Sequence, residues 1–273
     1  MNDIAASVRR TADVFPFAGY CDVLADAQIS VAQTVLRHLW RGATILDFGA
    51  GPCDKTSVLQ GLGYVCTGCD DLNDPWHLLP GNREKIIEFA RNSGIDFRLA
   101  AAGEALPYSQ EQFDMVMLHD VVEHLHDSPR ELLNDLVGLI KPDGLLFITV
   151  PNAGNIRKRL AVLMGGSNYP DIEYFYWTRG RWRGHVREYV RADLLSLADY
   201  LDLAVIELRA CDHMLRRLPA AIRPAYRAVT GLLPGLKDTW ALVCRKRHGW
   251  APRRSVAPDL QRAIDNRAQV YQQ

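Results

Sequence analysis

The segment from residue 45 to 52, Ile-Leu-Asp-Phe-Gly-Ala-Gly-Pro, constrains the fold of this chain more than any other. Its apolar start predicts a buried strand, and the closely spaced glycines predict a sharp turn at the end of that strand. Glycines let a backbone approach a ligand and offer its N–H groups, while the acid can accept hydrogen bonds from an ammonium or a hydroxyl. We therefore expect a nucleotide-type cofactor beside Asp47, Phe48, Gly49, Ala50 and Gly51.

The residues after this turn narrow the choice of cofactor. A dinucleotide fingerprint requires a third glycine three residues after Gly51, where this chain has Asp54, whose charge would face a pyrophosphate. A phosphate-binding Walker loop is excluded because the Lys55-Thr56 pair lacks the preceding G-x-x-x-x-G. NAD and FAD are thus disfavoured. S-adenosylmethionine (SAM), which carries a sulfonium, an α-amino group and a ribose but no phosphate, is the cofactor we expect.

With Asp47, Gly49 and Gly51 as its first motif, the chain resembles the class I SAM-dependent methyltransferases. Within them it resembles the small-molecule enzymes of the methyltransferase type 11/12/23 group and the ubiquinone-pathway O-methyltransferases. One departure is Cys53, which stands where the family commonly has a third glycine. Later segments, at residues 64–71, 102–108 and 113–125, resemble further family motifs in the correct order.

This resemblance implies the remaining cofactor contacts. Asp70 is expected to hold the ribose hydroxyls, with Asp71 as the alternative, because both follow the second strand. Gly103 and Glu104 are expected beside the adenine, although Ala102 occupies the family's usual acid position. His119, directly after the fourth strand, is expected to line the methionine portion of the cofactor.

Strand and helix patterns alternate along the chain, which predicts an α/β, Rossmann-like, doubly wound sheet with its ligand site beyond the carboxyl ends of the strands. The family resemblance implies that the sheet is mostly parallel with an antiparallel terminal strand, near residues 239–245. We expect the following organisation: a helical segment at 1–41, a SAM-binding core at 42–150, a substrate lid at 151–190, the end of the core with a helical insertion at 191–247, and a tail at 248–273.

The lid is unusual in composition. It combines aromatic with basic residues, which are Tyr169, Tyr174, Phe175, Tyr176, Trp177 and Trp182 with Arg157, Lys158, Arg159, Arg179, Arg181, Arg183, Arg187 and Arg191. One interpretation is an amphipathic cap whose aromatic side chains pack on the sheet. The other is an aromatic pocket with a guanidinium clamp for an anionic acceptor.

Histidines supply the candidates for acid–base chemistry. His185 is the best single candidate for a general base, because imidazole titrates near neutral pH, and a structural role in holding the lid is the alternative. Asp120, Glu123 and His124 resemble the metal site of ubiquinone-pathway O-methyltransferases, but the same residue types also occur on bare helix starts. We therefore include no metal in the expected site.

Charge and hydropathy bound the partners and the compartment. Thirty-two basic residues balance thirty-two acidic ones, so no global field favours nucleic acid. The N-terminus lacks the apolar core of a signal peptide, and we expect a cytoplasmic protein. Residues 213–236 contain four arginines and no acid, which favours peripheral membrane contact, whereas packing of Leu218, Ile222, Tyr226, Val229 and Leu233 in a core is the alternative.

These observations predict methyl transfer from SAM to a small-molecule acceptor, which we expect to be O-methylation of a sugar, a lipid or a secondary metabolite. Transfer to nitrogen or carbon stays open, as does a non-catalytic binding module that keeps the fold. The sequence identifies neither the acceptor nor the oligomeric state.

Overall fold

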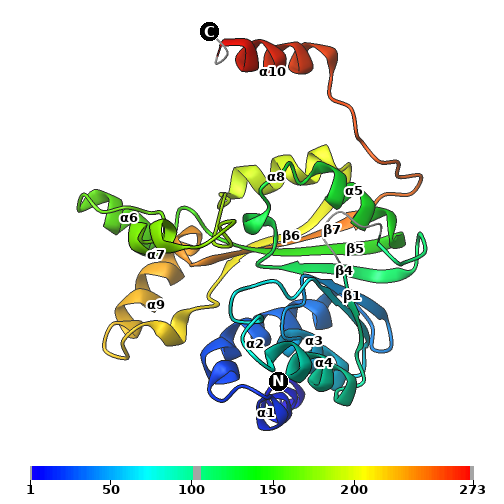
Figure 1. Ribbon diagram of the computed structural model, residues 1–273, viewed down its shortest axis with the longest axis vertical. Coiled ribbons are helices and arrows are strands. Elements are labelled where there is room, and N and C mark those ends of the chain that lie inside the picture. The colour runs from blue at the N-terminus through cyan, green and yellow to red at the C-terminus, as the bar shows by residue number, and fades with distance from the viewer. Residues whose placement is uncertain (1, 101–105, 271–273) are drawn as a thin grey trace.

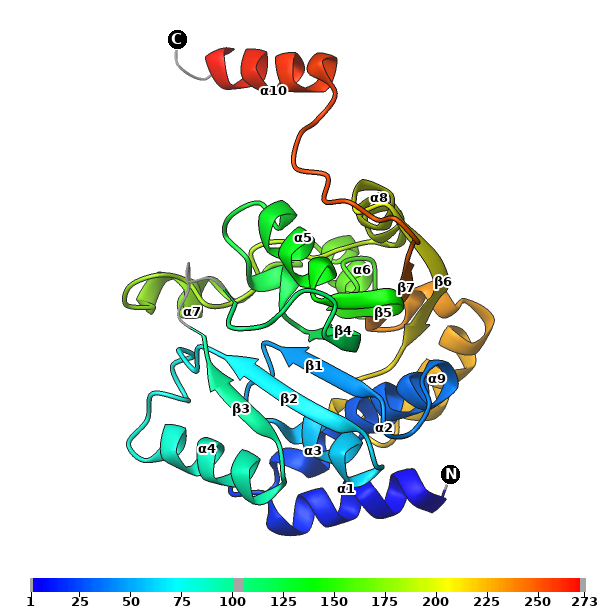
Figure 2. The same ribbon diagram turned by 90° about the vertical axis from the view of Figure 1, so that its right-hand side faces the viewer.

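The computed structural model describes residues 2–100 and 106–270. They form an α/β fold in which one seven-stranded sheet has helices on both faces (Figures 1 and 2). The strands are β1 (Thr44–Phe48), β2 (Val65–Asp70), β3 (Asp96–Leu99), β4 (Phe113–His119), β5 (Ile140–Pro151), β6 (Leu203–Cys211) and β7 (Thr239–Lys246). The helices are α1 (Asn2–Val14), α2 (Tyr20–His38), α3 (Asp54–Gly61), α4 (Asn82–Asn92), α5 (Arg130–Gly138), α6 (Ile156–Leu163), α7 (Ile172–Trp177), α8 (Arg191–Tyr200), α9 (Arg223–Leu232) and α10 (Pro258–Val270). Short 3-10 helices are η1 (Val122–His124), η2 (Leu215–Arg217) and η3 (Pro234–Leu236).

The strand order of the sheet is β3-β2-β1-β4-β5-β7-β6. β1 pairs in parallel with β2 and with β4, and only β7 runs antiparallel to its neighbours. The predicted Rossmann-like fold and its antiparallel last strand are confirmed, although β7 lies between β5 and β6 rather than at an edge. The order reverses between β1 and β4, and in open α/β sheets such a switch point opens a crevice for ligands.

Two apolar clusters hold the helices on the sheet. On one face, Leu133 of α5 and Leu194 of α8 share a buried cluster with Leu146 of β5. On the other face, α1, α2 and α3 bury their apolar sides against β1 and β4. Because β4 is covered on both faces, all of its residues are buried, which is typical of a central parallel strand.

The region after β5 and the tail depart from this compact arrangement. Residues 162–180, which include the whole of α7, are all exposed. α10 stands away from the body at the end of an extended segment (Figure 1). Among the described helices, none has the length and apolar character needed to cross a membrane.

Candidate functional site

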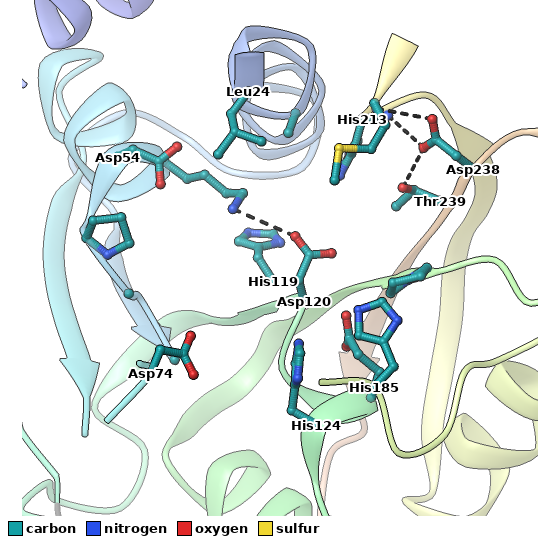
Figure 3. A pocket seen from close by; sticks show the side chains of 18 of the residues that line it. Leu24, Asp54, Asp74, His119, Asp120, His124, His185, His213, Asp238 and Thr239 are labelled. Atoms are coloured by element: carbon teal, nitrogen blue, oxygen red, sulfur yellow. Dashed lines mark hydrogen bonds and ion pairs between the residues drawn. The ribbon is translucent and has the colours of Figure 1, made fainter. Parts of the chain in front are cut away.

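A cavity of about 370 Å³ opens beyond the carboxyl ends of β1 and β4 (Figure 3). Its walls come from α2, the glycine turn after β1, η1, the lid and the segments that join β6 to β7. Among the lining residues are Gly49, Gly51, Lys55, His119, Asp120, Glu123, His124, Arg157, Lys158, His185, His213 and Asp238. The cavity therefore lies where the strand order places a ligand crevice.

The glycine turn has the conformation that its sequence predicts. Gly49 and Gly51 both have positive φ, at 72° and 51°. A Cβ on Gly49 would lie 2.4 Å from Cγ2 of Val121, whereas a Cβ on Gly51 would meet nothing within 4 Å. Cys53, at the position of the family's third glycine, adopts a φ of 62° and is buried, so the turn keeps its shape without that glycine. The open space in front of Gly51 fits a bound ligand.

Asp47 lies beneath the turn rather than on the cavity wall. Its side chain is 2 % exposed, and Oδ2 accepts a hydrogen bond of 2.6 Å from the Thr56 hydroxyl. Oδ1 has no hydrogen-bond partner among the described residues. Burial raises the pKa of Asp47 to about 7. An unpartnered buried carboxylate oxygen at this point fits a cofactor with an ammonium group.

The two predicted ribose ligands have different surroundings. The carboxylate of Asp70 accepts hydrogen bonds of 2.7 Å from the backbone N–H of Gly51 and of Leu72, and so ties the glycine turn to β2. Asp71 accepts one from Asn73 and lies 3.5 Å from the Arg183 guanidinium of the lid. Their contact with ribose stays a prediction. The predicted adenine contacts at 103 and 104 lie outside the described residues.

His119 ends β4 in the floor of the cavity. Its Nδ1 lies 3.0 Å from the Thr149 hydroxyl, and its ring contacts Phe147 edge to face at 4.8 Å between centroids. Nε2 has no partner among the described residues. Burial lowers the pKa of His119 well below its ordinary value, so the ring is neutral. A neutral, unpartnered ring suits its predicted place beside the cofactor.

The opposite wall brings together Glu123, His124 and His185. Glu123 is fully buried, neither carboxylate oxygen has a hydrogen-bond partner in the described structure, and burial raises its pKa well above the ordinary value. Nδ1 of His124 donates to the Arg183 carbonyl at 2.8 Å, and the rings of His124 and His185 lie 5.0 Å apart. His124 thus keeps its second ring nitrogen for another partner.

Glu188 orients His185. Nδ1 of His185 lies 2.7 Å from Oε1 of Glu188, whose other oxygen pairs with Lys158 of α6. Burial works to raise the pKa of Glu188, but the hydrogen bonds from His185 and Lys158 outweigh it, and the pKa falls below its ordinary value. An ionised Glu188 therefore fixes Nδ1 as the protonated nitrogen and leaves Nε2 as the basic one.

These side chains also fit a divalent ion. Ligand atoms of Glu123, His124 and His185 lie within 4.8 Å of one another, a mixed oxygen and nitrogen set. The metal alternative from the sequence grouped Asp120 with Glu123 and His124, whereas the group of candidate ligands in the described structure has His185 in place of Asp120. Asp120 adopts a φ of 57°, and its Oδ2 lies 3.8 Å from the Lys55 ammonium instead (Figure 3).

Known proteins share this architecture and part of this sequence. Residues 25–208 match the family model described as a methyltransferase domain. The chain belongs to this methyltransferase family. Its cofactor is SAM, as predicted.

Sequence identity to individual relatives is moderate. The methyltransferase is 30 % identical over 135 residues to a ubiquinone biosynthesis O-methyltransferase of Caulobacter vibrioides. The aligned region covers 49 % of this chain and 50 % of that one. The chain thus spans about half the length of the curated relatives it matches.

Solved structures resemble the methyltransferase over most of its length. A 1,6-didemethyltoxoflavin-N1-methyltransferase of Burkholderia thailandensis, solved with S-adenosylhomocysteine, has a TM-score of 0.53 at 19 % identity, covering 89 % of each chain. The [4+2]-cyclase SpnF has a TM-score of 0.55 at 16 % identity, covering 90 % of this chain and 94 % of that one. At such identity the likeness concerns the fold alone.

The lid of the methyltransferase differs from both interpretations of its sequence. Tyr169, Tyr174, Tyr176 and Trp177 are between 71 and 76 % exposed, so they neither pack on the sheet nor line the cavity. The basic residues Arg157 and Lys158 do reach the cavity wall. The aromatic pocket is therefore wrong for these four side chains, because α7 and the segment before it are exposed.

Sequence reasoning missed His213 and Asp238 as cavity residues. The buried Asp238 accepts hydrogen bonds from the backbone N–H of His213, at 2.8 Å, and of Met214. These residues lie just after β6 and just before β7, and they meet only because those strands are neighbours in the sheet. The one signal in the sequence that could have identified them as site residues is their position next to the ends of predicted strands.

Proposed function

We propose that the methyltransferase transfers the methyl group of SAM to an oxygen of a small-molecule acceptor bound between the glycine turn and His185. The observation that carries this proposal is the pairing of His185 with Glu188 on the cavity wall that faces the turn. Such a pair is typical of a general base held in one tautomer.

The proton balance follows from this pairing. SAM supplies an electrophilic methyl group on its sulfonium. Nε2 of His185 takes the proton of the acceptor hydroxyl while the new O–C bond forms and the C–S bond breaks, which leaves a neutral thioether. Glu188 accepts a hydrogen bond from Nδ1–H and stabilises the charge that the ring acquires. The protein otherwise aligns the two reactants and excludes water.

The acceptor is proposed from the cavity wall and the relatives. Arg157, which has no ion pair among the described residues, favours a sugar, lipid or secondary metabolite with an anionic group, whereas Lys158 is already paired with Glu188. The likeness to ubiquinone biosynthesis O-methyltransferases supports oxygen as the acceptor atom. Transfer to nitrogen or carbon is the alternative, and a binding module without catalysis is a second one.

A divalent cation offers a different way to activate the hydroxyl. Glu123, His124 and His185 would hold it, and the cation would lower the pKa of a bound hydroxyl. Chelation by EDTA separates the two cases. Activity that survives EDTA supports the base, and activity lost to EDTA and restored by Mg²⁺ or Zn²⁺ supports the cation.

The first test is calorimetric titration with SAM and S-adenosylhomocysteine. Asp47→Ala and Asp70→Ala should weaken binding strongly, because Asp70 holds the turn through two charge-assisted hydrogen bonds. Asp13→Ala, an exposed acid on α1, is the matched control. Absence of binding by folded wild-type protein would overturn the proposal. Binding without transfer of labelled methyl to any hydroxyl acceptor in a broad panel would favour the binding module.

A further inference from the structure

Lys55 is a charged residue of the cavity that has no part in the proposed methyl transfer. It follows the glycine turn as the second residue of α3 and lines the cavity. A cation in the first turn of a helix is disfavoured, because the helix dipole is positive there. Cα–Cβ bonds tilt toward the N-terminal end of a helix, which directs this side chain back toward the turn. The helix alone therefore gives no reason for a lysine at this position.

The Lys55 ammonium is enclosed, yet it makes no hydrogen bond within residues 2–100 and 106–270. Its side chain is 15 % exposed, and its Nζ lies 3.8 Å from Oδ2 of Asp120 (Figure 3). A charge-assisted hydrogen bond between nitrogen and oxygen is shorter, at about 2.7–2.9 Å. The three N–H donors of the ammonium thus remain for an anionic partner in the cavity.

Nearby acids keep Lys55 charged without occupying it. Burial works to lower the pKa of Lys55, but the charges of several acids, Asp54 first and Asp120 next, outweigh it and raise the pKa above its ordinary value. The carboxylate of Asp54 accepts a hydrogen bond of 2.8 Å from the Gln28 amide. Asp120 is 41 % exposed, so water weakens its attraction for the ammonium. A charged Lys55 is therefore available to a ligand.

Asp47 supplies the opposite charge close to Lys55. Oδ1 of Asp47 has no partner in the part of the chain that the structure describes. The Lys55 charge opposes the rise that burial causes in the pKa of Asp47, and it adds to the fall that burial causes in the pKa of His119. Lys55 thus lies near both residues that fit the methionine portion of SAM. That portion is a zwitterion, with an ammonium and a carboxylate on the same carbon.

We propose that Lys55 binds the carboxylate of the methionine portion of SAM, while Asp47 accepts a hydrogen bond from its ammonium. Two opposite charges recognise a zwitterion in one orientation, and they disfavour cofactor analogues that lack the carboxylate. The inference rests on SAM as the cofactor and not on the identity of the acceptor. It can therefore be tested with no acceptor present.

Calorimetric titration with two ligands tests the role of Lys55. S-adenosylhomocysteine has the carboxylate and decarboxylated S-adenosylhomocysteine lacks it, whereas both keep the ammonium and the nucleoside. The wild type should prefer the first ligand by about 10- to 100-fold, as expected for a hydrogen bond between charged groups. Lys55→Met should lose most of this preference through weaker binding of S-adenosylhomocysteine. Its affinity for the decarboxylated ligand should not fall, because that ligand is itself a cation.

Two control variants separate this role from a general effect on the cavity. Asp47→Ala should weaken both ligands to a similar degree and keep the preference, because both ligands carry the ammonium. Lys85→Met should bind both ligands as the wild type does, since Lys85 is exposed on α4 and does not line the cavity. Circular dichroism and urea unfolding show whether each variant is folded.

Three results would overturn the proposal. Equal affinity of the wild type for the two ligands would show that the carboxylate is not recognised. Equal weakening of both ligands by Lys55→Met would make Lys55 a structural partner of Asp120. Unchanged binding of both ligands by Lys55→Met would leave the cofactor carboxylate to another residue.

Discussion

Two walls of the cavity are built in different ways: the glycine turn, where we propose that SAM binds and which we call the cofactor wall, and the facing side with His185, where we propose that the acceptor binds and which we call the acceptor wall. The cofactor wall comes mainly from one short stretch of chain, the glycine turn after β1, and beneath it the Thr56 hydroxyl donates a buried hydrogen bond to Asp47. The acceptor wall combines η1, the lid and the ends of β6 and β7, which are far apart in the sequence. Local backbone geometry therefore fixes the first wall, whereas only the tertiary fold assembles the second.

The lid is attached to the core near its C-terminal end. The Glu123 carbonyl accepts hydrogen bonds from the N–H of Val186, at 2.7 Å, and of Arg187, and His124 donates to the Arg183 carbonyl. By contrast, residues 162–180 are exposed throughout. The same insertion thus contains a fixed part that belongs to the site and a free part that does not.

The largest effect is expected on catalysis, from variants in the fixed part of the lid, which contains His185 and Glu188. His185→Gln should lower kcat about 10³-fold with a small change in SAM affinity, because a positioned base contributes this much to proton transfer. Glu188→Gln should cause a smaller loss, because the amide oxygen can still accept the hydrogen bond from Nδ1–H but no longer carries the charge that stabilises the imidazolium formed during transfer. The assay uses an acceptor identified by methyl labelling. Weakened SAM binding by His185→Gln would show that the two walls are not separate.

The pH dependence of stability tests whether Asp47, which is buried beneath the glycine turn, has a raised pKa. Its pKa of about 7 in the folded protein lies above the ordinary value of 3.8, because burial disfavours the carboxylate. The folded state therefore holds a proton that the unfolded chain releases between these values. This contribution to stability is complete below about pH 4 and is lost as the pH rises through 7, by up to about 4 kcal/mol.

Urea unfolding of the wild type and of Asp47→Asn across this pH range measures the difference. The wild type should lose stability relative to the variant as the pH rises, because the amide does not ionise. Parallel pH curves for the two proteins would contradict a raised pKa for Asp47.

Gly49 and Gly51 separate steric contact from backbone strain within the same turn. Gly49→Ala should lower the free energy of unfolding by about 3 kcal/mol, since the new Cβ meets Val121 in addition to a positive φ. Gly51→Ala should lower it by only about 1 kcal/mol, because only the strain of a positive φ applies. Val121→Ala should restore part of the loss in Gly49→Ala. Equal losses in the two glycine variants would show that the contact is relieved without cost.

The sequence predicted the fold and the cofactor turn because both depend on local patterns. β1, the turn at Gly49 and Gly51, and α3 follow from apolar runs, glycines and helix starts. His213 and Asp238 were not predicted as site residues, because their meeting depends on the order of β6 and β7. The lid aromatics were placed wrongly, since composition does not show whether an apolar side chain faces a core or solvent.

The free part of the lid should have the smallest effect on the isolated protein. Tyr174→Ser with Trp177→Ser should change the free energy of unfolding by no more than about 0.5 kcal/mol, because these exposed side chains have little burial to lose. Phe147→Ser, in the buried centre of β5, should by contrast cost several kcal/mol. Urea unfolding of each variant gives both values. A large loss in the lid variant would mean that these aromatic side chains stabilise the fold itself, and the division of the lid into a fixed and a free part would then fail.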